Sequence, residues 1–449
     1  MTTKVITYGT FDMFHEGHRR LLERARELGD HLTVGVTSED YDATRGKLNV
    51  TEGLMQRIEG VRRSGLADEI IVEEYEGQKI HDVQSRDIDV FAIGSDWQGK
   101  FDYLSPYCQV IYLERTKGIS STDLRAVRNG TIRIGVVGSG RIASRFVPES
   151  RFVSGVSADV VYSPNAEHAQ AFADAHELDR ACATFDELLD ASDAVYIASP
   201  HGRHVEQVRE AIASGRHVLC EKPLALTAAE ATELFAAAQA ADVVLMEALK
   251  TAYAPGFRRM LAVAQGGSIG RVVSIDATFT KLLSPGREHD APDGGAITEL
   301  ASYALLPFVK LFGTQPSEVR ATSLRPSDAA VEVFSRIDLR YPGGIGTAKV
   351  GIGAKAEGDL VVAGTEGYLY VPAPWWLTDY FELRFEDPGR RERYYVKFAG
   401  GGLRYEIGEF ASVIRSGGTT SYMLRPEESI ALAGMIEDSR TNGRVFGLG

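Results

Sequence analysis

The sequence predicts an α/β protein with two successive doubly wound parallel sheets, followed by an α+β domain built on an open, largely antiparallel sheet. Strand-like and helix-like segments alternate as far as residue 249, and glycine-rich segments follow two of the strands. After residue 250 the strands lengthen, and apolar residues alternate with polar ones. At 449 residues the chain exceeds the size of one core, so we expect domains at 1–129, 130–249 and 250–449.

Composition excludes several classes of function. Apolar residues make up 44% of the chain and charged residues 25%, as in ordinary globular proteins. A formal net charge of -13 argues against a nucleic-acid partner. The sequence has no apolar run of about 18 residues, so we expect no membrane span. The chain starts with a strand pattern instead of a signal segment, and Cys108, Cys182 and Cys220 form neither a disulfide framework nor a metal spacing. We therefore expect a cytoplasmic protein without a protein-built metal site.

The first domain alternates five strands with helices. Helical spacing of Leu21, Leu22, Ala25 and Leu28 predicts a helix after the first strand. Ligands of such sheets bind beyond the carboxyl ends of the strands. The strands are expected at 4–8, 32–37, 69–72, 90–93 and 110–113.

The first strand runs into the sequence GTFDMFHEGH at residues 9–18. Gly17 permits a tight turn, and His15 and His18 fall on one side of the helix that begins there. A helix N-terminus favours an anion, and two imidazoles beside it can donate hydrogen bonds to a phosphoryl group that gains charge. The pattern predicts nucleotidyl transfer, with a pair of surface or metal-binding histidines as the alternative.

Residues 5–124 resemble the cytidylyltransferase-type nucleotidyltransferases, and among them the glycerol-3-phosphate cytidylyltransferases most closely. The shared motifs are GTFD with HEGH, Arg57 in a helix, GSDWQGKFD at 94–102 and RTKGISST at 115–122. The family has acidic residues where this chain has Ser95 and Lys117. The resemblance implies catalytic roles for His15 and His18 and places these residues at the nucleotide and acceptor: Gly9, Thr10, Phe11, Lys47, Arg57, Asp96, Trp97, Arg115, Ser120, Ser121 and Thr122.

In the implied reaction an alditol phosphate attacks the α-phosphorus of CTP, and pyrophosphate leaves with Mg²⁺. Such catalysis rests on positioning and charge stabilisation. Ser121 or Thr122 would cap a helix that runs to Arg128. Asn129-Gly130 would end this helix just before the first strand of the next domain. An adenylyltransferase and an ethanolamine-phosphate cytidylyltransferase remain alternatives for this domain.

The second domain begins with a strand at 132–137, followed by the dinucleotide pattern Gly138-x-Gly140-x-x-Ala143. Further strands are expected at 159–162, 194–198, 217–220 and 243–246, with a helix at 228–241. The cofactor is NAD or NADP. Ser163 stands near the position that is acidic in NAD-specific domains, which favours NADP slightly, with Arg141 as a candidate contact for the 2′-phosphate.

The sequence CEKP at 220–223, together with SPHGRH at 199–204, resembles the GFO/IDH/MocA oxidoreductases. The resemblance extends from Ile132 to about the C-terminus and implies that Lys222 lies near the nicotinamide, where it binds or protonates the substrate oxygen. A surface lysine at a strand end is the alternative. The expected cofactor contacts are Gly138, Gly140, Arg141, Ala143, Ser163, Ser199, His201 and Glu221.

The third domain has alternating Val331, Val333, Ile337 and Leu339, and Pro342-Gly343-Gly344 predicts a hairpin turn. In the resembled family this sheet packs against a partner subunit, so we expect a homo-oligomer whose C-terminal helix packs back on the second domain. Four aromatic residues are expected at an interface, a pocket wall or the core: Trp375, Trp376, Tyr380 and Phe381.

The resembled family carries an Asp and a His four residues apart on a helix, where this chain has Glu299 and Tyr303. That spacing puts both side chains on one helix face. Tyr303 is the candidate proton donor beside Lys222, with a core role or a binding-only site as alternatives. Lys250 and Tyr253 are expected to face the same pocket.

Together the domains suggest a bifunctional enzyme whose substrates are CTP, an alditol phosphate and NAD(P). The oxidoreductase would reduce a keto or aldehyde phosphate, and the cytidylyltransferase would convert the product to a CDP-alditol for cell-wall polymer synthesis. The alternatives are oxidation of an unrelated sugar, or a non-catalytic NAD(P)-binding dimerisation module.

Overall fold

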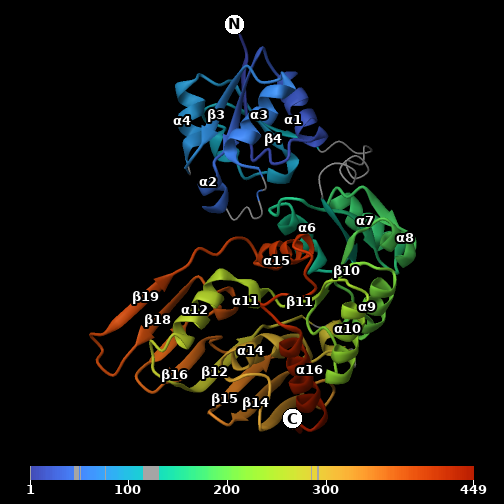
Figure 1. Ribbon diagram of the computed structural model, residues 1–449, viewed down its shortest axis with the longest axis vertical. Coiled ribbons are helices and arrows are strands. Elements are labelled where there is room, and N and C mark those ends of the chain that lie inside the picture. The colour runs from blue at the N-terminus through green and yellow to red at the C-terminus, as the bar shows by residue number, and fades with distance from the viewer. Residues whose placement is uncertain are drawn as a thin grey trace. The chain divides into compact units, whose positions relative to one another are not determined.

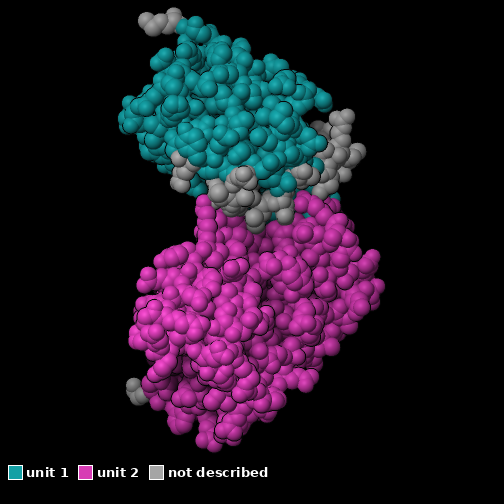
Figure 2. All heavy atoms as spheres, turned by 60° about the vertical axis from the view of Figure 1, so that its left-hand side comes forward, with its two compact units in different colours: residues 1–134, 144–183 teal, residues 135–143, 184–449 magenta. Residues whose placement is uncertain are grey.

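The computed structural model describes residues 2–44, 50, 52–75, 77–114, 131–284, 286–290 and 293–448. The chain forms two compact units (Figure 2). One comprises residues 1–134 and 144–183, and the other comprises residues 135–143 and 184–449. Within the described residues, no helix is both long and apolar enough to cross a membrane.

The first sheet is parallel throughout and has the strand order β3-β2-β1-β4-β5. All five expected strands are confirmed to within two residues. Its strands are β1 (Lys4–Gly9), β2 (His31–Thr37), β3 (Glu69–Glu73), β4 (Val90–Gly94) and β5 (Gln109–Leu113). Its helices are α1 (Glu16–Arg26), α2 (Glu39–Thr44), α3 (Leu54–Ser64) and α4 (Gln78–Ser85), with short 3-10 turns η1 (Ser95–Trp97) and η2 (Asp102–Leu104).

Two apolar layers sandwich this sheet because alternate residues of β1 point to opposite faces. Val5 belongs to the layer formed with α1 and α3, and Ile6 belongs to the layer on the opposite face, which includes Val83 of α4. Both side chains are fully buried. The centre of the sheet is therefore packed with apolar side chains on both faces.

The second sheet has the order β11-β10-β9-β6-β7-β8. The expected strands are present, β11 lying two residues later than predicted, and the short strand β8 was not anticipated. Its strands are β6 (Ile132–Val137), β7 (Val156–Tyr162), β8 (Arg180–Cys182), β9 (Ala194–Ile197), β10 (His217–Glu221) and β11 (Leu245–Ala248). Its helices are α6 (Ala143–Ser150), α7 (Ala166–Ala175), α8 (Phe185–Asp190), α9 (His204–Ala213) and α10 (Ala228–Ala240), with the short 3-10 turn η3 (His201–Arg203).

The third sheet is mixed and has the order β19-β18-β17-β16-β12-β15-β14-β13-β20. Only β12–β15 and β13–β20 pair in parallel among its described neighbours. Its strands are β12 (Val272–Thr280), β13 (Glu318–Pro326), β14 (Phe334–Tyr341), β15 (Gly344–Gly351), β16 (Leu360–Gly364), β17 (Tyr368–Val371), β18 (Tyr380–Arg384), β19 (Arg391–Tyr395) and β20 (Arg444–Leu448).

The hairpin prediction for this sheet is confirmed, because Tyr341 pairs with Gly344 across the turn between β14 and β15. Ile337 and Leu339 point to the buried face of β14, whereas Val331 and Val333 are buried just before that strand begins. Strand β20, at the sheet's edge, was not anticipated from the sequence.

Helices cover one face of the third sheet (Figure 1). α14 (Ala296–Phe312) packs across β12 and β15 and is buried along most of its length, as its apolar sequence requires. α16 (Pro426–Thr441) packs on α14 and on α10, and Glu437 accepts a hydrogen bond from the Ala228 amide at 3.0 Å. The remaining helices are α11 (Lys250–Tyr253), α12 (Pro255–Gln265), α13 (Arg287–Asp290) and α15 (Leu403–Arg415), with the 3-10 turn η4 (Trp375–Leu377).

The expected helix from Ser121 to Arg128 and the domain seam around Asn129-Gly130 lie outside the described residues.

Candidate active sites

The histidine pair stands where the loop after β1 enters α1. His15 is the N-cap of α1, and its Nδ1 accepts hydrogen bonds from the amides of Gly17 at 3.1 Å and His18 at 3.4 Å. A neutral imidazole that accepts at Nδ1 carries its proton on Nε2. The His15 and His18 rings stack with their centroids 3.7 Å apart. This arrangement leaves Nε2 of His15 as a donor of the kind that an anion requires.

The loop between β1 and α1 has a strained backbone. Phe11 and Met13 have φ angles of 53° and 49°, which residues other than glycine adopt rarely. Two reciprocal hydrogen bonds brace the loop: the Glu52 amide donates to Asp12 at 2.8 Å, and the Met13 amide donates to Glu52 at 2.9 Å. The Phe11 ring is buried in the core, so the loop offers its backbone, and not that ring, to a nucleotide.

Arg57 lies entirely beneath this loop, where it serves as an internal brace. Its Nη1 donates to the carbonyls of Thr10 and Thr37, both at 2.7 Å, and Nε donates to the Glu52 carbonyl at 2.9 Å. Asp42 completes the group, because it accepts from Thr10 Oγ1 at 2.9 Å and lies 3.5 Å from Arg57 Nη1. Within the described residues, the Nη2 atom of Arg57 has no hydrogen-bond partner.

A cavity opens beside the braced loop, with Thr10, Asp12, His15 and His18 in its wall. The structure thus brings Thr10 together with both predicted catalytic histidines. Gly9 closes the strand before them, and Trp97 packs on the Phe101 ring. Lys47, Arg115, Ser120, Ser121 and Thr122 lie outside the described residues, as does the side chain of Asp96.

The dinucleotide turn after β6 has the geometry that its glycines imply. Gly138 has a φ of +105°, and a Cβ atom there would lie 2.8 Å from the Ala198 carbonyl oxygen. A Cβ at Gly140 would meet no atom within 4 Å, which leaves open space for a phosphate to approach the backbone. Ala143 is buried where α6 begins. Arg141 reaches from the turn to Glu288, with 3.1 Å between Nη2 and Oε1.

The segment at 199–204 is tied to the EKP segment. His204 is fully buried, with Nδ1 2.9 Å from the Pro223 carbonyl and Nε2 3.0 Å from the Ser199 carbonyl. Burial lowers the pKa of His204 to about 3, so its imidazole is neutral at physiological pH. The Ser199 hydroxyl donates to Gln207 at 2.6 Å. Ser163 follows directly after the last residue of β7.

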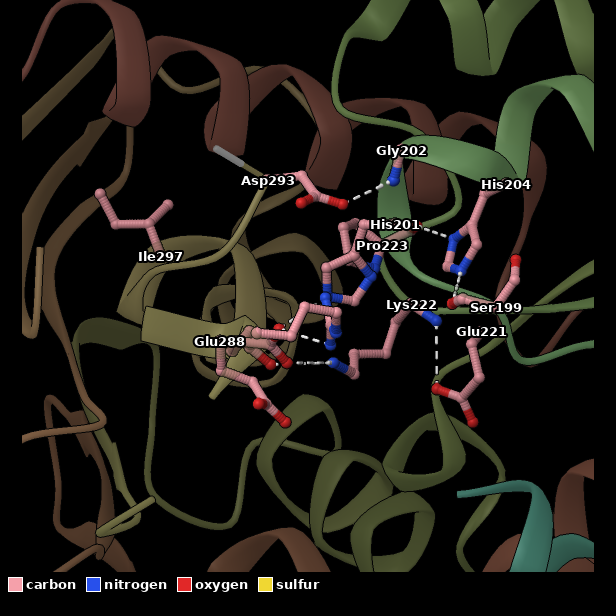
Figure 3. Close-up of polar contacts among 12 residues, drawn as sticks. Ser199, His201, Gly202, His204, Glu221, Lys222, Pro223, Glu288, Asp293 and Ile297 are labelled. Carbon is pink, nitrogen blue, oxygen red and sulfur yellow. Dashed lines mark hydrogen bonds and ion pairs between the residues drawn. The ribbon is translucent and has the colours of Figure 1, made fainter. Parts of the chain in front are cut away.

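Glu299 is the centre of the second candidate site, and Figure 3 shows two of its neighbours, His201 and Lys222. Its Oε1 lies 3.0 Å from His201 Nε2 and 3.1 Å from Arg287 Nη2, and its Oε2 lies 3.9 Å from Lys222 Nζ. Burial would raise the pKa of Glu299, but the His201 hydrogen bond and the Lys222 charge lower it to about 2. Burial also lowers the pKa of His201. Glu299 is therefore a carboxylate held by three neighbouring side chains.

Lys222 and Tyr303 lie beside each other in this site. Lys222 Nζ donates to the Glu299 main-chain oxygen at 2.9 Å and lies 5.9 Å from the centre of the Tyr303 ring. The Tyr303 ring meets Phe279 edge-on at 5.1 Å, and Trp376 stacks on Phe279 at 3.6 Å. These rings give the site an apolar wall.

Glu221 contacts both the Tyr196 hydroxyl and the main chain of Lys222. It accepts a hydrogen bond from the Tyr196 hydroxyl at 2.6 Å and one from the Lys222 amide at 3.3 Å, and burial raises the pKa of its carboxyl. Lys250 donates to the Gly401 carbonyl at 2.9 Å, and buried Tyr253 donates to the Glu247 carbonyl at 2.8 Å. The side chains of Lys250 and Tyr253 are thus each held by a main-chain carbonyl.

The predicted aromatic group divides between core and pocket wall. Trp375 and Phe381 are fully buried, and Trp375 Nε1 donates to the Thr278 carbonyl at 2.8 Å. Trp376 belongs to the wall beside Tyr303, and Tyr380 packs on Tyr395 at 4.9 Å.

Four contributors to the two sites were not foreseen from the sequence: Asp42, Glu52, Arg287 and Glu288. All are charged residues in or beside short helices, and no motif distinguishes them. The only available signal was the placement of Arg287 and Glu288 shortly before the helix of Glu299.

Three family models match successive parts of the chain. The family model "Cytidylyltransferase-like" matches residues 6–127. The model "Oxidoreductase family, NAD-binding Rossmann fold" matches residues 132–249, and "GFO/IDH/MocA C-terminal domain" matches residues 257–370.

Individual relatives follow this division. A glycerol-3-phosphate cytidylyltransferase of Bacillus spizizenii is 49% identical over 122 residues, which are 27% of this chain and 94% of the relative. The scyllo-inositol 2-dehydrogenase (NADP(+)) IolU of Bacillus subtilis is 29% identical over 324 residues, which are 69% of this chain and 96% of the relative. The crystal structure of a 3-ketoreductase from Actinomadura kijaniata with NADP and TDP-benzene has a TM-score of 0.65 at 24% identity and covers 71% of this chain and 99% of its own.

Proposed function

The chain belongs to the cytidylyltransferase-like proteins in its first part and to the GFO/IDH/MocA oxidoreductases in the rest, and from this we propose that its two reactions are consecutive. The oxidoreductase would reduce a phosphorylated ketose or aldose to an alditol phosphate. The cytidylyltransferase would then transfer CMP from CTP to that product. The 49% identity to a glycerol-3-phosphate cytidylyltransferase is the observation that carries the choice of an alditol phosphate as acceptor.

In the proposed transfer step, the alditol phosphate oxygen attacks the α-phosphorus and pyrophosphate leaves. His15, held by its Nδ1 hydrogen bonds, would donate from Nε2 to the phosphoryl oxygens as their charge grows. His18 lies beside it in the same wall. Mg²⁺ would arrive with CTP, and the Asp12 carboxylate in that wall is an oxygen ligand of the type Mg²⁺ prefers.

In the proposed reduction step, Lys222 and Tyr303 hold the substrate oxygen and supply its proton. A bound NADP(H) would supply the hydride. Glu299 keeps the Lys222 ammonium in place through its main-chain oxygen and its carboxylate. We propose NADP over NAD because Ser163 stands where an acidic residue would otherwise exclude a 2′-phosphate.

The test of the coupled function is to supply the intact protein with CTP, NADPH and a panel of ketose phosphates, and to search for a CDP-alditol by mass spectrometry. We expect CDP-alditol formation to require both nucleotides. Pyrophosphate release that needs a preformed alditol phosphate, with no NADPH oxidation on any precursor, would contradict the coupling.

A second candidate function is oxidation of an unrelated cyclic polyol. The similarity to the inositol dehydrogenase, which spans 69% of this chain, favours it. NADP-dependent turnover of inositols in place of sugar phosphates would identify this alternative.

We further propose a cytoplasmic homo-oligomer in which the open face of the third sheet meets a second copy. Tyrosine and arginine are enriched at protein interfaces. On β17 and β18 this face carries Tyr370, over which Arg384 lies at 4.3 Å, and Arg384 also pairs with Glu382. Sedimentation of the wild type and of an Arg384→Glu variant would test this assembly.

A further inference from the structure

We propose that Arg287 binds the phosphate of the oxidoreductase substrate and thereby selects phosphorylated over neutral sugars. The inference rests on the proposed function for the nature of the reaction, and it adds a binding residue and a physical reason for the substrate class. The connection between β12 and α14, in which Arg287 lies, was not assigned a role from the sequence.

The charges around Glu299 do not balance. Its carboxylate is approached by two cations, Lys222 and Arg287, and by His201, whose pKa burial lowers. Glu288, which directly follows Arg287 in the sequence, is paired with Arg141. Glu299 and the two cations that approach its carboxylate therefore carry one net positive charge together, and the more exposed cation, Arg287, is placed to meet an anionic ligand.

Two polar atoms of this cluster lack a partner among the described residues. One is the buried Nη1 of Arg287, a donor, and the other is the buried Nδ1 of His201. Because His201 Nε2 faces a carboxylate, that nitrogen carries the proton and Nδ1 is an acceptor. Buried polar groups are almost always satisfied, so both atoms point to a missing ligand. The ligand needs an anionic group for the guanidinium and a hydroxyl for the imidazole, which a sugar phosphate provides together.

The side chains of this cluster differ in how much of their surface is exposed to solvent. The side chain of Arg287 is 36% exposed, compared with 12% for Lys222, 9% for Glu299 and 6% for His201. A substrate that enters from solvent therefore reaches Arg287 first. Its phosphate would stay at Arg287, while the carbonyl group reaches Lys222 and Tyr303 further in.

The segment that carries Arg287 is held on both sides. Glu288 pairs with Arg141 of the dinucleotide turn, and Asp293 accepts a hydrogen bond from the Gly202 amide at 2.8 Å (Figure 3). The Gly295 amide also donates to the Glu288 carbonyl at 2.8 Å. These contacts hold the backbone on both sides of Arg287. Its side chain now pairs with Glu299 and could pair with a substrate phosphate instead. Arginine suits this exchange because its planar fork can contact two oxygens at once.

A direct test is chemical protection of Arg287 in the full-length protein with NADP bound. The protein is treated with phenylglyoxal, which modifies exposed arginines, in inorganic phosphate or in potassium chloride of equal ionic strength. Peptide mapping then gives the modification rate of each arginine. We expect phosphate to slow modification of Arg287 at least threefold and to leave the exposed Arg258 unchanged. Equal rates at Arg287 in both salts would overturn the proposal, whatever the enzyme reduces.

A kinetic test compares carbonyl substrates with and without phosphate, such as dihydroxyacetone phosphate and dihydroxyacetone, by NADPH oxidation. We expect Arg287→Gln to raise KM for the phosphorylated member at least tenfold and to change the neutral member little, with partial recovery in Arg287→Lys. Arg258→Gln is the matched control and should behave as the wild type. An equal loss on both members would contradict a role in phosphate binding. If no phosphorylated compound is reduced, the proposed function fails, and the protection experiment still decides the role of Arg287.

Discussion

Lys222 Nζ donates a hydrogen bond to the main-chain oxygen of Glu299 at 2.9 Å and lies 3.9 Å from the carboxylate of the same residue. The strand end that carries Lys222 is thereby joined to α14, the helix that carries Tyr303. Glu299 thus fixes the placement of Lys222 relative to Tyr303.

Glu299→Gln should lower kcat of the oxidoreductase about tenfold to a hundredfold, because Lys222 loses its counter-charge, and should leave cytidylyl transfer unchanged. The folded-state pKa of Glu299 is lowered to about 2. Its ionised form therefore contributes stability above its ordinary pKa, and this contribution is lost as the pH falls toward 2. Urea unfolding should show the largest difference between wild type and variant near neutral pH. A difference that grows with acidity would contradict this assignment.

Glu247→Gln should stabilise the protein at alkaline pH. Burial raises the pKa of Glu247 to about 6, so the folded state prefers the neutral acid, and stability falls as the pH rises through 6. Glutamine keeps an oxygen that can accept the Leu224 amide, as Glu247 does at 3.1 Å. We expect a gain of about 2 kcal/mol at pH 8, from the usual energy per pKa unit, and almost none below pH 4.5. Thermal unfolding at both pH values is the measurement.

Asp42→Ala should weaken cytidylyl transfer by raising KM for CTP about tenfold, because it removes the acceptor that holds Thr10 and one support of the buried Arg57. Asp42→Asn, which keeps an acceptor oxygen, should recover most of the affinity. Pyrophosphate release measures both variants. The control is Glu59→Ala, which removes only exposed ion pairs on α3. Unchanged kinetics in Asp42→Ala would show that the brace does not shape the nucleotide loop.

Lys222→Ala should separate the two activities. NADPH oxidation should fall by about a hundredfold or more, because the substrate oxygen loses its cation and proton donor. CTP-dependent transfer to a preformed alditol phosphate should continue at the wild-type rate. Loss of both activities together in a folded variant would argue against independent sites.

Ser163→Asp should shift cofactor preference toward NAD. A carboxylate at the end of β7 can bind the ribose 2′-hydroxyl and repels a 2′-phosphate. We expect the ratio of kcat/KM for NADPH over NADH to fall about tenfold or more, equivalent to about 1.4 kcal/mol. An unaltered ratio would remove Ser163 from the cofactor site.

The sequence predicted those parts of both sites that depend on local chain geometry. The period of a helix or strand determines where some residues lie. Examples are a histidine at a helix start, a glycine beside a strand end, and two residues four apart on a helix. For this reason His15, Gly138, Glu299 and Tyr303 occupy the expected kinds of position.

Contacts between distant segments could not be read in this way. The resemblance placed Arg57 at the nucleotide and acceptor but gave no sign that α3 would bury its side chain fully beneath Thr10, 47 residues away. The pairing of Arg141 with Glu288 spans 147 residues. Such contacts depend on how whole elements pack, and periodicity carries no information about that.

The connection between β12 and α14 also bears on how such an enzyme could be redirected to a new substrate. It supplies Arg287 to the site, and its described residues contribute no strand to the third sheet. Exchange of this one connection for that of another oxidoreductase would therefore replace the outer recognition group and keep Lys222, Glu299 and Tyr303 in register. A designer who wants a neutral or cationic substrate should begin at Arg287 and leave the helix behind it intact.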